Sequence, residues 1–269
     1  MIHTSDYLNK SGYNSKCLNY ITQTNADVYS EEIISSKFIV LPMPLSRDGI
    51  SINGTISENG EISLKYFYSI ISKNTVIITS ALPKEEIFEC TGHFDYSKSE
   101  SYLLENAYLT AEGAIGHALL NSPKSLRDST VLILGWGRIA KFLHQMLCKF
   151  TDNVSVMLRN EEAHKTLRDN GIDAYLFSEL ESVIQSFDII INTVPSPVIP
   201  SSALNSTKKE AYISELASKP GGYDHEYARK IDRSSYILRG LPGICAPESA
   251  GAALGKCIIS YIENGVTRI

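Results

Sequence analysis

The chain has 269 residues, of which 43% are hydrophobic and 20% are charged, and its formal net charge is −5. This composition is typical of a globular protein of one or two domains and excludes a disordered chain. The acidic balance argues against a nucleic-acid partner, because phosphate binding needs a basic face. No apolar run reaches the roughly 18 residues of a membrane-spanning helix, and the first ten residues lack the apolar core of a signal peptide. We therefore expect a cytoplasmic protein that binds neither nucleic acid nor membrane.

The cysteines are scattered along the chain and no two of them have metal-ligand spacing. An odd, dispersed set of this kind is typical of reduced thiols in a protein core. We therefore predict no metal site. The five residues are Cys17, Cys90, Cys148, Cys245 and Cys257.

The first part of the chain, residues 1–109, is predicted to form a smaller α/β domain. Phe38–Leu41 and Val76–Ile78 are apolar runs typical of buried strands. Between them, Arg47–Glu61 contains one Asp-Gly and two Asn-Gly pairs. These pairs favour tight turns, so we expect a turn-rich hairpin in that segment.

Residues 110–246 alternate short apolar runs with helical segments, which predicts an α/β domain with a doubly wound parallel sheet of the Rossmann type. A linker helix over 110–121 enters this domain, with Thr110 as its N-cap. A C-terminal helix within 247–269 follows it and is expected to bridge the domains. The expected strands are Val131–Leu134, Val154–Leu158, Asp173–Leu176, Asp188–Thr193, Ala211–Leu216 and Ser235–Leu238.

The first of these runs leads into a glycine motif, Gly135-Trp136-Gly137-Arg138-Ile139-Ala140. In a strand–turn–helix context, Gly135 permits the tight turn and Gly137 lets the backbone approach a pyrophosphate. The N-terminus of the following helix then faces the phosphates. We predict a dinucleotide site here, with residues 135–139 in contact with the cofactor; a nucleotide-binding fold with a dead site is the alternative.

The second strand of this domain ends at Leu158 and is followed by Arg159 and Asn160. NAD enzymes place an acidic residue here, on the ribose 2′-hydroxyl, whereas a guanidinium suits a 2′-phosphate. The sequence therefore favours NADP, with Arg159 and Asn160 as binding residues. The alternative is a solvated arginine at a strand end.

Three further strand ends are predicted to line the nicotinamide half of the cofactor site, since ligands lie outside the carboxyl ends of parallel strands. Their Gly and Pro residues also fit simple turns, and that alternative stays open. None of the histidines has the pattern of a catalytic base, although His225 follows one of these segments. The cofactor contacts expected here are Thr193, Val194, Pro195, Leu216, Leu241 and Pro242.

These motifs together resemble the family of the dipicolinate synthase A protein. The resemblance runs from Thr110 to the C-terminus and is carried by Thr110–Ile115, the Gly135 motif, Ile191–Pro195, Leu216–Asp224 and Gly240–Gly251. It implies the two-domain architecture of D-2-hydroxyacid dehydrogenases, with a flavodoxin-like N-terminal domain. It also implies NADP-linked oxidation of a dihydrodipicolinate to dipicolinate during spore formation, the dipicolinate synthase B protein as a partner, and a homo-oligomer.

The chain departs from the pattern that this resemblance implies at three places. The family opens with a strand that ends in Gly-Gly-Asp, whereas this chain begins Met1-Ile-His-Thr-Ser-Asp6, so its first domain is expected to be shortened or to lack an element. Glu248 stands where a lysine is expected, and Glu215 where an aspartate is expected. The first of these two changes removes a possible carboxylate-binding cation.

A dicarboxylate substrate needs cations or clustered N–H donors. Lys219 follows the fifth strand of the nucleotide domain and is the first candidate; Arg47, after a first-domain strand, is the second. Asn192 and Glu112 are expected to take part through hydrogen bonds. For Lys219 and Arg47 the alternative is a solvated loop charge.

Two other functions stay open from the sequence. One is a different two-domain NAD(P)-dependent dehydrogenase that acts on a 2-hydroxy or 2-oxo acid. The other is a non-catalytic NADP-binding protein that serves a partner.

Overall fold

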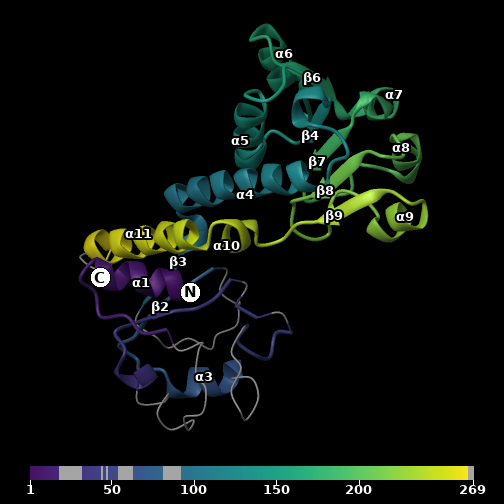
Figure 1. Ribbon diagram of the computed structural model, residues 1–269. Helices are drawn as coiled ribbons and strands as arrows, with labels where there is room; N and C mark the ends of the chain where they lie inside the picture. Colours follow the sequence, from purple (N-terminus) through teal and green to yellow (C-terminus); the bar gives the residue numbers. More distant parts are fainter. Residues whose placement is uncertain (18–31, 44, 47, 54–62, 81–91, 266–269) are drawn as a thin grey trace. The chain divides into compact units, whose positions relative to one another are not determined.

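The computed structural model describes residues 1–17, 32–43, 45–46, 48–53, 63–80 and 92–265. The chain forms two compact units (Figure 1). The first comprises Met1–Glu105 together with Pro247–Ile269, and the second comprises Asn106–Ala246.

The first unit contains a parallel sheet in the order β1-β2-β3, made of β1 (Phe38–Val40), β2 (Val76–Thr79) and β3 (Gly92–Asp95). Helix α3 (Leu64–Ile70) precedes β2 and is capped by Ser63. Helices α1 (Ile2–Lys10) and α11 (Pro247–Gly265) lie side by side. Their approach needs Gly251, because a Cβ there would lie 2.6 Å from the His3 carbonyl carbon.

The second unit is built on a six-stranded, fully parallel sheet in the order β6-β5-β4-β7-β8-β9. The chain starts in the centre at β4, winds outward to β6, and then returns to add β7 on the other side of β4. The carboxyl ends of β4 and β7 are therefore the point where the winding reverses, which is where such sheets bind ligands. The strands are β4 (Val131–Leu134), β5 (Val154–Leu158), β6 (Asp173–Leu176), β7 (Ile189–Asn192), β8 (Tyr212–Glu215) and β9 (Ser234–Ile237).

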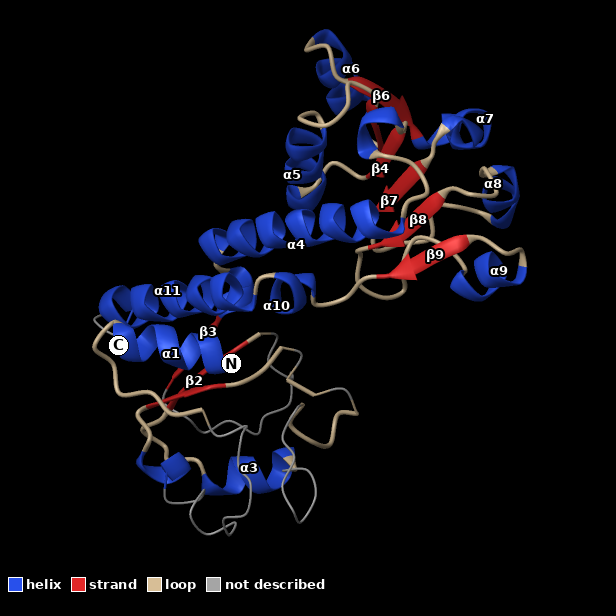
Figure 2. Ribbon diagram, viewed as in Figure 1, coloured by secondary structure: helices blue, strands red, loops and turns tan. Residues whose placement is uncertain are grey.

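Helices cover both faces of this sheet (Figure 2), because its strands are apolar on both sides. Val131 and Ile133 pack against α4 (Glu100–Asn121), α5 (Arg138–Leu147) and α6 (Glu161–Asp169). Leu132 and Leu134 pack on the other face, where the remaining helices lie. Those helices are α7 (Leu180–Val183), α8 (Ser201–Ser206) and α9 (His225–Lys230). A short helix, α10 (Leu241–Cys245), follows β9 and precedes α11.

The six strands predicted for the nucleotide domain are all present, and the α/β Rossmann class is confirmed. The expected start of the linker helix at Thr110 is wrong. Helix α4 begins at Glu100, and the Thr110 hydroxyl donates to the Asn106 carbonyl at 2.6 Å, as in a helix interior.

Two features of the first unit were not predicted in this form. Strand β3 was missed because Gly-His-Phe-Asp is neither a continuous apolar run nor β-branched. The expected hairpin over 47–61 lies largely outside the described residues, although Ser51 and Ser63 form an isolated antiparallel bridge. Within the described part of the chain, no helix has the length and apolarity needed to cross a membrane.

Candidate functional site

The Gly135 turn joins β4 to α5 at the point where the winding of the sheet reverses. Gly135 has a φ of +103°, and a Cβ there would lie 2.5 Å from Thr193 Oγ1 and 3.0 Å from Val194 Cγ2. The Thr193 hydroxyl in turn donates to the Leu134 carbonyl at 2.7 Å. Gly135 is therefore required by the packing of this turn against the loop after β7.

Gly137 is exposed and is the N-cap of α5, with no side-chain capping hydrogen bond. A Cβ at Gly137 would meet no described atom within 4 Å. Open space thus lies beside the first N–H groups of a ten-residue helix, which is where an anion binds favourably. The neighbouring Trp136 and Ile139 are half-buried at the turn, and Arg138 is exposed.

Arg159 is exposed at the end of β5 and lies beside two groups from other loops. Its guanidinium donates to the Ser196 hydroxyl at 2.9 Å and lies 5.9 Å from the centre of the Phe177 ring. Asn160 caps α6 by accepting from the Ala163 amide at 2.7 Å. The strand end therefore offers a guanidinium at the position where NAD enzymes present a carboxylate.

Asn192 and Glu215, at the ends of β7 and β8, are fully buried and bonded to each other. The Asn192 Nδ2 group donates to Glu215 Oε1 at 2.8 Å and to the Val194 carbonyl at 3.0 Å, and Asn192 Oδ1 accepts from the Val194 amide. Both the donor and the acceptor of the Asn192 amide are thereby engaged within the protein. Asn192 was predicted to hydrogen-bond the substrate; in the structure its bonds hold the loop that follows β7.

His225 lies next to this pair, with its Nε2 3.9 Å from Glu215 Oε2. Burial lowers the pKa of His225, and the negative charge of Glu215 acts in the opposite direction. His225 is thus a partly buried imidazole close to a buried carboxylate. Ser196 and Glu215 were not among the predicted site residues, although the sequence pattern marks Glu215 as a charged residue at the end of an apolar run, where the family resemblance expects an aspartate.

The predicted substrate-contacting residues are placed differently from one another. Lys219 and Glu112 are exposed, and the side chain of neither makes a hydrogen bond or ion pair with the described residues. Arg47 lies outside the described residues. Leu216, Leu241 and Pro242, which were predicted to contact the cofactor, are buried, so their side chains pack within the protein.

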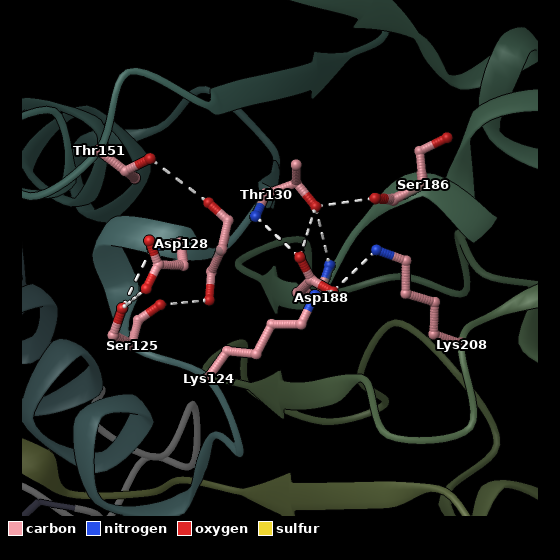
Figure 3. Close-up of polar contacts among 9 residues, drawn as sticks. Lys124, Ser125, Asp128, Thr130, Thr151, Ser186, Asp188 and Lys208 are labelled. Carbon is pink, nitrogen blue, oxygen red and sulfur yellow. Dashed lines mark hydrogen bonds and ion pairs between the residues drawn. The ribbon is translucent and has the colours of Figure 1, made fainter.

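The opposite edge of the sheet holds a separate polar cluster, around Asp188 (Figure 3). Asp188 Oδ1 accepts from Lys124 Nζ and Lys208 Nζ, both at 2.8 Å, and its Oδ2 accepts from the amide and hydroxyl of Thr130. Burial favours a higher pKa for Asp188, but these bonds outweigh it and hold the pKa well below its usual range. This cluster fixes the amino ends of β4 and β7.

Other features of the described residues lie away from the glycine turn. A cavity of about 470 Å³ in the first unit is lined by residues of α1, β1 and α11 and by none of the predicted site residues. Within the described ranges, no group of three or more His, Cys, Asp and Glu side chains is arranged to hold a metal.

Comparison with known proteins places these features in a family context. The family described as Shikimate / quinate 5-dehydrogenase matches residues 118–217, which include the glycine turn, Arg159 and the loop after β7. The dipicolinate synthase A protein of Bacillus subtilis (strain 168) is 28% identical over 237 residues, which cover 84% of this chain and 77% of that protein.

Solved structures of dipicolinate synthase A proteins have the same fold. The one from Bacillus subtilis matches with a TM-score of 0.75 and 25% identity, over 87% of this chain and 80% of that one. The one from Bacillus halodurans matches with a TM-score of 0.75 and 22% identity, over 87% and 82%. Along most of its length this chain is similar in sequence and in fold to the dipicolinate synthase A protein, and its second unit has a fold of the dehydrogenase type.

Proposed function

We propose that this chain is an NADP-dependent oxidoreductase that oxidises a dihydrodipicolinate to dipicolinate. The observation that carries the proposal is the glycine turn at the reversal point of a six-stranded parallel sheet, with Arg159 beside it, in a chain similar to the dipicolinate synthase A protein. The turn supports a dinucleotide, and the arginine supports the choice of NADP.

The residues at the turn fit such a cofactor. The open space at Gly137 and the N–H groups at the start of α5 suit a pyrophosphate. Arg159, with Ser196 and Asn160 next to it, suits the 2′-phosphate. Thr193, Val194 and Pro195 follow β7 and suit the nicotinamide half. When bound, NADP supplies the acceptor for a hydride.

The substrate carries two carboxylates, and the chain has to bind and orient them next to the nicotinamide. Lys219 is an exposed cation on the loop after β8 and is assigned to one carboxylate. Oxidation removes a hydride and a proton from the ring and makes it aromatic. Aromatisation is itself favourable, so orientation accounts for much of the catalysis and a strong general base is not required.

Two further parts of the proposal, the dipicolinate synthase B protein as a partner and a role in spore formation, rest on the similarity to the dipicolinate synthase A protein alone. A homo-oligomer is proposed on the same ground.

A second candidate function is a different NAD(P)-dependent dehydrogenase of hydroxy acids. The match of residues 118–217 to Shikimate / quinate 5-dehydrogenase favours this alternative. That match covers only the nucleotide-binding part, so it supports a dehydrogenase without pointing to dipicolinate as the product.

The test is a substrate comparison with the purified full chain. NADP reduction is measured with enzymatically generated dihydrodipicolinate and, separately, with shikimate, quinate and a set of small 2-hydroxy acids. We expect reduction with the first substrate and none with the others. Turnover of a hydroxy acid without turnover of dihydrodipicolinate would replace the proposal with the second candidate.

A further inference from the structure

Glu215 is a fully buried carboxylate at the end of β8, and it accepts hydrogen bonds from three N–H donors. Its Oε1 accepts from Asn192 Nδ2 at 2.8 Å and from the Ala217 amide at 2.9 Å. Its Oε2 accepts from the Gly222 amide at 2.6 Å. These donors come from the end of β7 and from the beginning and end of the 216–222 loop.

Both side-chain oxygens of Glu215 have to accept hydrogen bonds, because each of them faces at least one N–H group. An ionised carboxylate has only acceptors, so it satisfies all three N–H groups at once. A glutamine of the same shape would point its NH₂ group at an N–H group, whichever way the amide is turned. A buried donor left without an acceptor is costly, so the contact selects glutamate rather than glutamine.

The glycines of the Lys219-Pro220-Gly221-Gly222 segment are required by the same contacts. A Cβ at Gly222 would lie 2.2 Å from Asn192 Nδ2 and 2.6 Å from Asn192 Cγ. Gly221 has a φ of +90°, and a Cβ there would lie 3.1 Å from Glu215 Oε2. The two glycines therefore let the loop pack against Asn192 and Glu215. Contacts within the protein are thus enough to require glycine at both positions.

The contacts extend to the loop after β7. The Gly222 carbonyl accepts from the amides of Val198 and Ile199 at 2.8 and 2.9 Å. The 193–200 and 216–222 loops are thus bonded to each other through Gly222, whose amide is held by Glu215. Because β7 and β8 are parallel neighbours in the sheet, both loops leave the same edge.

We propose that Glu215 is a positioning residue for substrate binding: through Asn192 and Gly222 it fixes the 216–222 loop, and with it Lys219, against the loop that carries Thr193–Pro195. The expected effect on substrate binding rests on the proposed function, whereas the fixing of the two loops by Glu215 does not depend on it.

Hydrogen exchange measured by mass spectrometry on the full chain tests the loop contact directly. In Glu215→Gln, we expect peptides covering 193–200 and 216–222 to exchange at least tenfold faster, with β4 unchanged. Glu210→Gln makes the same chemical change at an exposed glutamate and is expected to leave both loops as in the parental protein. Parental exchange in both loops of Glu215→Gln would overturn the proposal.

The shorter Glu215→Asp variant covers the case in which Glu215→Gln does not fold. Aspartate keeps two acceptor oxygens, but its side chain is one methylene shorter. We therefore expect the hydrogen exchange of the two loops to be faster than in the parental protein and slower than in a chain that lacks the contact. Exchange equal to the parental value in this variant would also overturn the proposal.

Cofactor binding and steady-state kinetics then distinguish a positioning role of Glu215 from a general loss of structure. In Glu215→Gln we expect the Kd for NADPH to stay within twofold of the parental value and the KM for dihydrodipicolinate to rise at least tenfold. Combining it with Lys219→Ala should add little to the KM, because both variants disable the same cation. Additive effects would mean that Glu215 does not act through Lys219. If the parental protein turns over no dihydrodipicolinate, the proposed function fails, while the exchange measurement still decides the loop contact.

Discussion

The Arg159 guanidinium donates a hydrogen bond to the Ser196 hydroxyl at 2.9 Å, and this contact joins the end of β5 to the loop after β7. Strand β4, which ends in the Gly135 turn, lies between β5 and β7 in the sheet. The contact therefore spans the edge at which a dinucleotide is proposed to bind. It holds the guanidinium at that edge and uses one of its N–H groups, and since an arginine has five, others can still donate to a ligand.

Replacement of Arg159 is expected to change cofactor preference. A charge-assisted contact with a 2′-phosphate contributes about 1.5–3 kcal/mol, so Arg159→Ala should weaken NADPH binding roughly tenfold or more. NADH lacks that phosphate and should bind nearly as before. Fluorescence titration with both cofactors measures this, with Arg127→Ala at the opposite edge as the matched control. Tighter binding of NADH than NADPH by the parental protein would contradict the assignment.

The two glycines of the turn are expected to respond differently. Gly137→Val places its side chain in open space beside the helix N-terminus, so the protein should fold and lose dinucleotide binding. Gly135→Ala forces an alanine to adopt a φ of +103° and pushes its Cβ against Thr193, so it should lower the melting temperature. Thermal unfolding and cofactor titration of both variants test this. Unchanged cofactor affinity in Gly137→Val would remove the pyrophosphate assignment.

Truncation of Lys219 is expected to affect substrate binding and leave the cofactor bound. One contact with a carboxylate contributes ~1.4 kcal/mol or more, so Lys219→Ala should raise the KM for dihydrodipicolinate about tenfold or more, or lower kcat to a similar degree. Lys230→Ala, at the exposed end of α9, is the control. Steady-state kinetics identical to those of the parental protein would exclude Lys219 from the site.

Asp188 is expected to stabilise the second unit in a pH-dependent way. Its pKa is held below the ordinary 3.8 once the bonds from Lys124, Lys208 and Thr130 outweigh the effect of burial. A depressed pKa gives stability that is present above the unfolded value and is lost as the pH falls through the folded one. Asp188→Asn should therefore lower the free energy of unfolding by about 1–3 kcal/mol at neutral pH, and the difference should shrink below about pH 4.

Urea unfolding of the parental protein and Asp188→Asn at several pH values measures this difference. Asp169→Asn, at an exposed position on α6, should show no such pH-dependent loss. A constant difference between the parental protein and Asp188→Asn from pH 7 to pH 3 would contradict the role of the carboxylate.

The sheet of the second unit was predictable because its strands are continuous apolar runs separated by helical segments. Val131–Leu134 and Val154–Leu158 have the predicted bounds. The start of α4 was not predictable in the same way, since Glu100–Leu109 mixes charged and apolar residues and tertiary packing decides where the helix begins.

The geometry of the glycine turn was also predictable, because each small residue of the motif has a local geometric reason. The bond between Asn192 and Glu215 was not predictable in this form. The two residues are distant in sequence and meet only because β7 and β8 are neighbours in the sheet. The Arg159–Ser196 contact likewise depends on loop conformations that strand patterns do not specify.

The most direct test of NADP-linked oxidation is a coupled assay that starts from enzymatically generated dihydrodipicolinate, run with the purified chain alone and with the dipicolinate synthase B protein added. NADPH formation and dipicolinate are measured in the same reaction. We expect dipicolinate to appear in equal amount with NADPH, faster with NADP than with NAD, and to vanish in Gly137→Val. Dipicolinate formation that is unaffected by Gly137→Val, or no dipicolinate under either condition while a 2-hydroxy acid is oxidised, would contradict the proposed function.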